Sequence, residues 1–186
     1  METGHSIPIL PCTESREPNV PAGATYEPIA TTTLGSAQSS VTFSSISGSY
    51  TDLVLVFDGL TTAASDAIGF QIKVNGASGT LQSYTRLQGN GTTASSSRAQ
   101  DGDPAVGVVG NSERTNIIAH IMNYSNSTTY KTIISRYNSN DAGDGRTGAY
   151  VNLTRATTAI TSLLVDLSTG SFASGSTFTL YGIASA

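Results

Sequence analysis

The stretch Gly170-Ser-Phe-Ala-Ser-Gly-Ser-Thr-Phe-Thr-Leu-Tyr-Gly-Ile-Ala184 decides the fold of this chain. From Thr177 to Gly182, polar residues alternate with apolar or small ones, which is the period of a strand with one buried and one wetter face. The glycines and serines before Thr177 mark the turn that leads into it. A final strand is stable only beside strands formed earlier in the sequence. We therefore expect a β framework that the last strand closes.

The composition of the whole chain favours the same fold class. Of the 186 residues, 38% are hydrophobic and 12% are charged, whereas an ordinary soluble domain has roughly 25% charged residues. Serine, threonine, glycine, asparagine and alanine replace the missing charge, and straight-chain helix formers are scarce. These features predict one all-β domain with many short strands and little helix.

Charge and cysteine content exclude several classes of function. The net charge is −4, and the nine lysines and arginines are scattered singly, so we expect no nucleic-acid binding. The single cysteine, Cys12, rules out an internal disulfide framework. No apolar run is long enough for a transmembrane helix, and the N-terminus lacks the features of a signal peptide. We expect neither membrane insertion nor secretion by a signal peptide.

Residues 1–23 differ in composition from the rest of the sequence. They hold four of the six prolines, which remove backbone donors and favour extended conformations. One interpretation is a disordered tail. The other is an extended N-terminal arm that becomes ordered on a neighbouring subunit, with Ile7, Ile9, Leu10 and Val20 as its apolar anchors. The four apolar residues favour the arm, and residues 24–186 then form the folded domain.

Strand patterns follow one another from Thr25 onward. Pro28 places the first strand at a sheet edge, and the apolar run of residues 52–58 predicts a central strand covered on both faces. Residues 89–104 read as the longest loop, a length that often accompanies binding or assembly. Antiparallel connections predict a two-sheet β-sandwich of Greek-key or jelly-roll type. The expected strands are residues 26–34, 39–46, 52–58, 68–75, 81–88, 106–109, 115–124, 129–137, 149–154, 159–167 and 177–183.

Four segments in this order resemble a group of small virion proteins of tailed bacteriophages, including phages of cyanobacteria and marine bacteria. They are residues 49–56 (Ser-Tyr-Thr-Asp-Leu-Val-Leu-Val), 123–132 (Asn-Tyr-Ser-Asn-Ser-Thr-Thr-Tyr-Lys-Thr), 158–164 (Thr-Ala-Ile-Thr-Ser-Leu-Leu) and 175–183 (Gly-Ser-Thr-Phe-Thr-Leu-Tyr-Gly-Ile). The resemblance implies a jelly-roll domain that serves as a capsid decoration (cement) protein or a tail or fibre component, commonly as a trimer. It also implies synthesis in the host cytoplasm and release by lysis.

The sequence offers no catalytic constellation. Its two histidines are His5 and His120, and the pattern predicts His120 to be an ordinary strand residue on the same side as Tyr124. No Gly-x-Ser-x-Gly elbow is present. Asp52 and Asp58 stand at opposite ends of one strand, too far apart for a pair of catalytic carboxylates. We expect no enzyme activity.

Two loops offer oxygen ligands for a cation. Asp101 and Asp103 lie in one of them, and Asp141 and Asp144 lie in the other. Aspartates at such positions more commonly form turns, and the spacing does not match an EF-hand, although a structural cation remains an alternative. No cluster of cysteine and histidine exists for zinc. We therefore predict neither a metal site nor a cofactor.

Our leading hypothesis is a decoration protein on the capsid exterior that binds the major capsid protein as a homotrimer. Residues 1–23 would lie along the shell or a neighbouring subunit, and trimerisation would multiply weak contacts. The alternative is a tail or fibre component that binds a host receptor or surface glycan. Its recognition surface would be the loops 89–104 and 138–145, with Tyr137 and Asp144 as residues to test.

Overall fold

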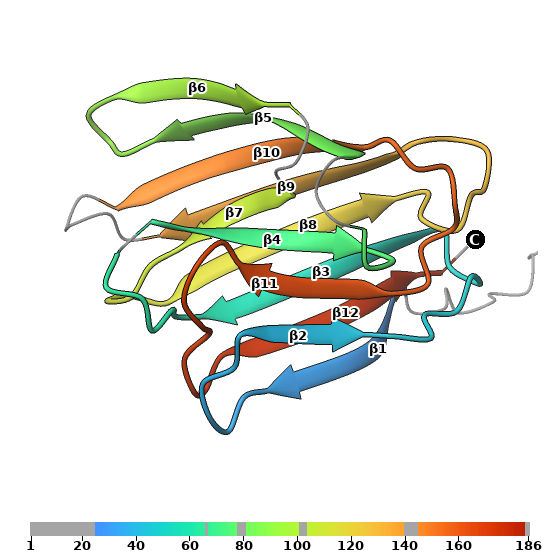
Figure 1. The fold of residues 1–186 in the computed structure, drawn as a ribbon, viewed down its shortest axis with the longest axis horizontal. Helices are drawn as coiled ribbons and strands as arrows, with labels where there is room; N and C mark the ends of the chain where they lie inside the picture. The colour runs from blue at the N-terminus through green and yellow to red at the C-terminus, as the bar shows by residue number, and fades with distance from the viewer. Residues whose placement is uncertain (1–24, 66, 78–80, 101–103, 140–144, 185–186) are drawn as a thin grey trace, which may run out of the picture.

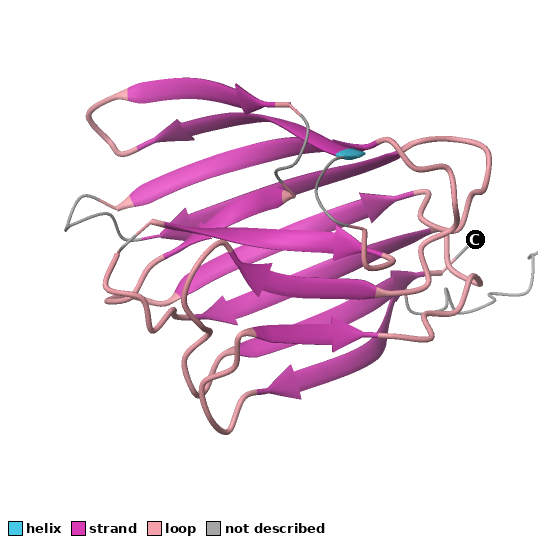
Figure 2. Cartoon of the chain, in the orientation of Figure 1, coloured by secondary structure: helices cyan, strands magenta, loops and turns pink. Residues whose placement is uncertain are grey.

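The computed structural model describes residues 25–65, 67–77, 81–100, 104–139 and 145–184, which form two antiparallel sheets (Figures 1 and 2). The smaller sheet has the strand order β2-β11-β4-β7, and the larger has the order β1-β12-β3-β8-β9-β10-β5-β6. The strands of the smaller sheet are β2 (Ser40–Phe43), β11 (Leu163–Leu167), β4 (Ile68–Val74) and β7 (Ala105–Val109). Those of the larger are β1 (Tyr26–Thr33), β12 (Thr177–Ile183), β3 (Asp52–Gly59), β8 (Thr115–Met122), β9 (Lys131–Ser139), β10 (Arg146–Thr154), β5 (Gln82–Gly89) and β6 (Ala94–Ala99).

The expected all-β, two-sheet architecture is confirmed. The closing strand β12 lies between β1 and β3, so the last strand of the sequence completes a sheet built by much earlier ones. Its Phe178 and Leu180 are fully buried, as the alternation predicts. The first strand, β1, lies at an edge and carries Pro28 there, which is also as predicted.

Phenylalanine side chains fill the space between the two sheets. Phe57 from β3, Phe70 from β4, Phe178 from β12 and Phe172 from the preceding turn are all fully buried. Their ring centroids lie 4.8 to 5.9 Å apart in tilted or edge-on geometries, the range that aromatic pairs prefer. This cluster joins strands that are distant in sequence and holds the two layers together.

The central position predicted for residues 52–58 is confirmed, because β3 pairs with β12 and β8. The predicted cover on both faces of this strand is not found among the described strands. Leu53, Leu55 and Phe57 point to the core, whereas Val54 and Val56 point to the other side. On that side no second layer of strands lies among the described residues, and Val54 is flanked instead by its cross-strand neighbours on the same sheet.

The prediction of a loop over residues 89–104 is wrong in part, because six of these residues form the strand β6. Gly91 adopts a φ of +84°, and the Asn90 side chain accepts hydrogen bonds from the backbone N–H groups of Thr92 and Thr93. These contacts make a tight hairpin between β5 and β6. The strand was missed because it lies at an edge and has no alternating apolar residues.

The β8–β9 hairpin is confirmed, but Tyr124 does not lie on the side of His120. Asn123 has a φ of +51°, which breaks the strand alternation after Met122. The Tyr124 ring therefore enters the core, where its hydroxyl donates to the carbonyl of Ser47. At the end of the same hairpin, the buried Lys131 ammonium donates to the carbonyls of Asn126, Thr129 and Thr157, and burial lowers the pKa of Lys131.

Candidate binding face on the larger sheet

The two sheets differ in width, and the wider one has a face with no described layer over it. We call this side, turned away from the smaller sheet, the outer face. Across β8, β9, β10 and β5 it carries a group of exposed apolar side chains, which we call the apolar patch. Its members are Leu87, Ile118, Met122, Ile134, Val151 and Leu153, with exposed fractions of 37% to 61%. They are six of the nine large hydrophobic residues that are exposed in the described part of the chain.

The sheet register brings the members of the apolar patch together on one face. Ile134 on β9 lies directly opposite Val151 on β10 and has His120 on its other side. One register step along, Ile118, Arg136, Ala149 and Leu87 form a second cross-strand row. Residues opposite each other in an antiparallel sheet have Cβ atoms about 4.5 to 5.5 Å apart. The patch thus spans four neighbouring strands.

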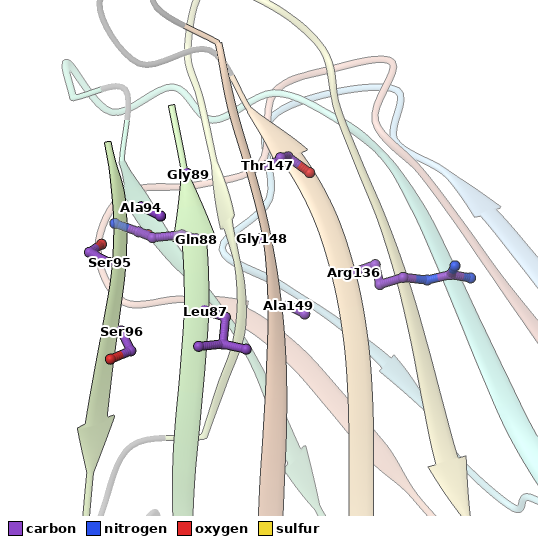
Figure 3. A pocket seen from close by; sticks show the side chains of 10 residues that line it. All are labelled: Leu87, Gln88, Gly89, Ala94, Ser95, Ser96, Arg136, Thr147, Gly148 and Ala149. Carbon is purple, nitrogen blue, oxygen red and sulfur yellow. The ribbon is translucent and has the colours of Figure 1, made fainter. Parts of the chain in front are cut away.

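The outer face has shallow, open depressions. A depression of about 730 Å³ lies over β6, β5, β10 and β9, lined by residues that include Leu87, Ala149 and Arg136. Figure 3 shows these three on adjacent strands, with the guanidinium of Arg136 extended away from Leu87. A second hollow of about 380 Å³ includes Val151 and Leu153 in its lining. These two depressions make the surface of the patch uneven.

A third hollow, of about 280 Å³, surrounds His120. Its lining is Asp52, Ile118, His120, Met122, Ile134 and Arg136, which includes no serine, threonine or cysteine that could act as a nucleophile. The carboxylate of Asp52 accepts a hydrogen bond of 2.6 Å from the backbone N–H of Asn123, so it has a structural role at the start of the β8–β9 turn. In this hollow, His120 and Arg136 lie beside apolar side chains in the cross-strand rows.

Several residues considered in the sequence analysis are not described by the structure. Ile7, Ile9, Leu10 and Val20 of the proposed arm lie outside the described residues. The same holds for the candidate cation ligands Asp101, Asp103, Asp141 and Asp144. Within the described part of the chain, no group of three or more histidine, cysteine, aspartate or glutamate side chains is placed to hold a metal ion.

Tyr137, proposed for a glycan-binding surface, lies inside the sandwich with 3% of its surface exposed. Its hydroxyl donates to the side-chain oxygen of Gln88 at 3.1 Å, and its ring lies 5.8 Å from that of Tyr150. Arg86 lies over the Tyr150 ring at 5.9 Å. Burial alone would lower the pKa of Arg86, but the hydrogen bond to Tyr150 and the neighbouring tyrosines raise it overall. These residues form a packed aromatic layer under β5 and β10, not an open site.

The sequence contains adjacent pairs of large apolar residues that point to the apolar patch, although simple alternation of apolar and polar residues does not account for them. In Ile117-Ile118, Ile133-Ile134 and Tyr150-Val151, two large apolar residues are adjacent, so one of each pair must point away from the core. In each pair the first residue is buried and the second is exposed on the outer face. Each of these strands therefore carries apolar side chains on both faces, although only one of its faces is covered.

No helix in the described part of the chain is long and apolar enough to cross a membrane. A scan against models of protein families found no match to this chain, and neither did searches of curated proteins and of solved structures.

Proposed function

We propose that this chain is a structural protein of a bacteriophage virion, a decoration protein that binds the major capsid protein through the apolar patch of its larger sheet. The observation that carries the proposal is the group of six exposed apolar side chains on one face across β8, β9, β10 and β5. Large exposed apolar patches with a polar rim mark sites of protein association.

The patch suits a permanent contact on a particle. It sits on the middle strands of a sheet whose opposite face is packed against the core, so its side chains are held in place before binding. Ile118, Ile134 and Val151 are β-branched and lose little rotamer freedom on contact. Arg136 and Thr132 lie on β9 between apolar members of the patch, and their polar groups would fix the orientation of a bound partner.

The resemblance to phage virion proteins supports the choice of particle. Two of its segments fall on β3 and β12, the centre of the larger sheet, and a third spans the β8–β9 turn with Lys131. The jelly-roll type of the sandwich is what this resemblance implies, and it is part of our proposal. The homotrimer, the arm over residues 1–23 and the tail or fibre alternative stay predictions.

The proposal is tested with the double variant Ile134→Thr and Val151→Thr. Threonine keeps β-branching and strand preference while removing apolar contact. The control is Tyr26→Thr, which removes an exposed aromatic ring from β1, at the far edge of the same sheet and outside the patch. We expect the double variant to lose at least about tenfold in affinity for capsids that lack the protein, the size of effect that removing two central contacts produces.

The measurement is co-sedimentation of purified full-length chain with such capsids, followed by cryo-electron microscopy of the decorated shells. Retained binding by the double variant contradicts the role of the patch. Absence of the wild-type chain from the capsids, or density confined to the tail, contradicts the decoration role itself.

A further inference from the structure

The four sheet edges of this domain are not equally protected. An unpaired edge strand offers free N–H and C=O groups to any other strand, and natural proteins block such edges with proline, bulges, short strands or cover. In β1, Pro28 removes one donor and the pairing with β12 shifts register between Pro28 and Ala30. At one edge of the smaller sheet, β2 has only four residues. Both of these edges are poor templates for a further strand.

The other edge of the smaller sheet, β7, is capped by side chains. Ser135 donates to the carbonyl of Val106, and Asn152 donates to that of Ala105 at 3.0 Å. All five residues of β7 are buried, and a register shift interrupts the pairing of β7 with β4. The larger sheet thus occupies carbonyls on this strand that a new strand would need.

The fourth edge, β6, has no proline, bulge or cover among the residues that the structure describes. Its six residues read Ala-Ser-Ser-Ser-Arg-Ala, without proline or lysine, and it pairs with β5 in unbroken register from Gly89 to Tyr84. Most of its side chains are exposed, and in Figure 1 β6 lies at the end of the larger sheet, past the strands of the smaller one. Among the described strands, β6 is the edge left open for pairing.

The hairpin geometry identifies which groups of β6 are free to pair. Asn90 donates its N–H to the carbonyl of Thr93, its directly opposite residue, so this is a hydrogen-bonded pair. Hydrogen-bonded and non-bonded pairs alternate along an antiparallel ladder. Ser95 and Ser97 therefore bond to β5, while the N–H and C=O groups of Ala94, Ser96 and Arg98 point away from the sheet.

We propose that β6 pairs with β6 of a second copy of this chain, antiparallel about a two-fold axis through Ser96. In this register Ser96 faces Ser96 of the second copy, and Ala94 faces its Arg98. All the outward main-chain groups of Ala94, Ser96 and Arg98 gain partners, which no other two-fold register achieves. The two arginines face alanines rather than each other, so no like charges are opposed. Small serine and alanine side chains present no steric obstacle.

The pairing would continue the larger sheet from one copy into the next and place the two outer faces on the same side. Leu87 lies one strand away from β6, so the apolar patches of both copies would face one direction. The contact does not depend on the proposed function, because it uses the strand edge rather than the patch. It is also compatible with a three-fold contact elsewhere on the domain.

Cross-linking tests the register directly. In a full-length Cys12→Ser background, Ser96→Cys supplies the only thiol, and in the proposed pairing the two Cα atoms lie about 5.5 Å apart, within disulfide range. The control Ser95→Cys places its two thiols diagonally, about 7 to 8 Å apart between Cα atoms, beyond that range. We expect the disulfide-linked dimer to form about tenfold more for Ser96→Cys than for Ser95→Cys under mild oxidation. Equal yields, or none from Ser96→Cys, would overturn the proposal.

A second variant separates pairing from folding. Ser96→Pro removes an N–H that points away from the sheet, which an edge strand tolerates. By analytical ultracentrifugation we expect this variant to lose the concentration-dependent association through β6 and to keep the wild-type melting temperature. Unchanged association of a folded Ser96→Pro variant would also refute the pairing, and should that variant not fold, the cross-linking result still decides.

Discussion

The larger sheet has two parts, one under the smaller sheet and one that extends beyond it. Toward β12 and β3, its inner face packs on the phenylalanine cluster under the smaller sheet. Toward β5 and β6, it extends past that sheet, and its inner side is lined by Tyr84, Tyr150 and Arg86 instead. Because the larger sheet is wider than the smaller one, the aromatic cluster between the sheets lies toward β12 and β3. The strands toward β5 and β6 have no strand of the smaller sheet opposite them.

The largest expected effect is a difference in the free energy of unfolding between a variant in the covered part and a variant on the outer face. Phe178→Ala removes a fully buried ring that contacts Phe57 and Phe172, and we expect the free energy of unfolding to fall by about 3 to 5 kcal/mol. The matched change on the outer face is Leu87→Ala, at the most exposed member of the apolar patch. There we expect a change within about 0.5 kcal/mol.

Urea denaturation of both variants measures these changes. If Leu87→Ala were as destabilising as Phe178→Ala, the outer face would be part of the core of the isolated chain, and the distinction between the two parts would fail.

The covered part could be predicted from the sequence more fully than the uncovered one. Alternation placed Phe178 and Leu180 in the core, and Pro28 marked β1 as an edge. Both signals are local, because one buried face imposes a period of two. The edge strand β6 has no buried face, so it leaves no such period and was taken for a loop.

The apolar patch could not be located by the same means, because its position depends on which strands lie side by side in the larger sheet and on which of their faces the smaller sheet covers. That depends on pairing between distant segments, such as β10 with β5, and not on any single stretch. Adjacent apolar pairs such as Ile133-Ile134 indicated two apolar faces but not which of them would stay exposed. Asn123 shows another limit, since its positive φ reversed the side on which Tyr124 lies.

A smaller effect tests how tightly the covered part is packed. A Cβ atom added at Gly182 in β12 would come within 2.3 to 2.5 Å of the Tyr50 ring, so one of the two must shift. We expect Gly182→Ala to lower the free energy of unfolding by about 1 to 3 kcal/mol, as overpacking does. Gly35→Ala is the matched control, because nothing lies within 4 Å of the added atom and its φ is not positive.

Thermal unfolding followed by circular dichroism compares the two alanine variants. Equal melting temperatures would mean that Tyr50 moves aside at no cost, and that packing at this end of the sandwich is looser than the contacts indicate.

The smallest effect concerns the hydroxyl of Tyr124, which joins the β8–β9 turn to the loop before β3. It donates to the carbonyl of Ser47 and accepts from the N–H of Tyr50 at 3.3 Å. Tyr124→Phe removes both bonds, and at neutral pH we expect a loss of about 1 kcal/mol. The control is Tyr26→Phe, at a half-exposed ring of β1, where we expect no change.

The pH dependence of this difference supplies the sharper test. Burial raises the pKa of Tyr124 above its ordinary value of 10.0, so in rising pH the unfolded chain loses this proton before the folded one. The unfolded state then binds fewer protons, and the stability of the wild type falls with pH above 10. Phenylalanine has no proton to lose, and Lys131, whose own pKa is lowered, cancels because both chains contain it. The stability advantage of the wild type should therefore narrow above pH 10, and a constant difference would place the Tyr124 hydroxyl in water.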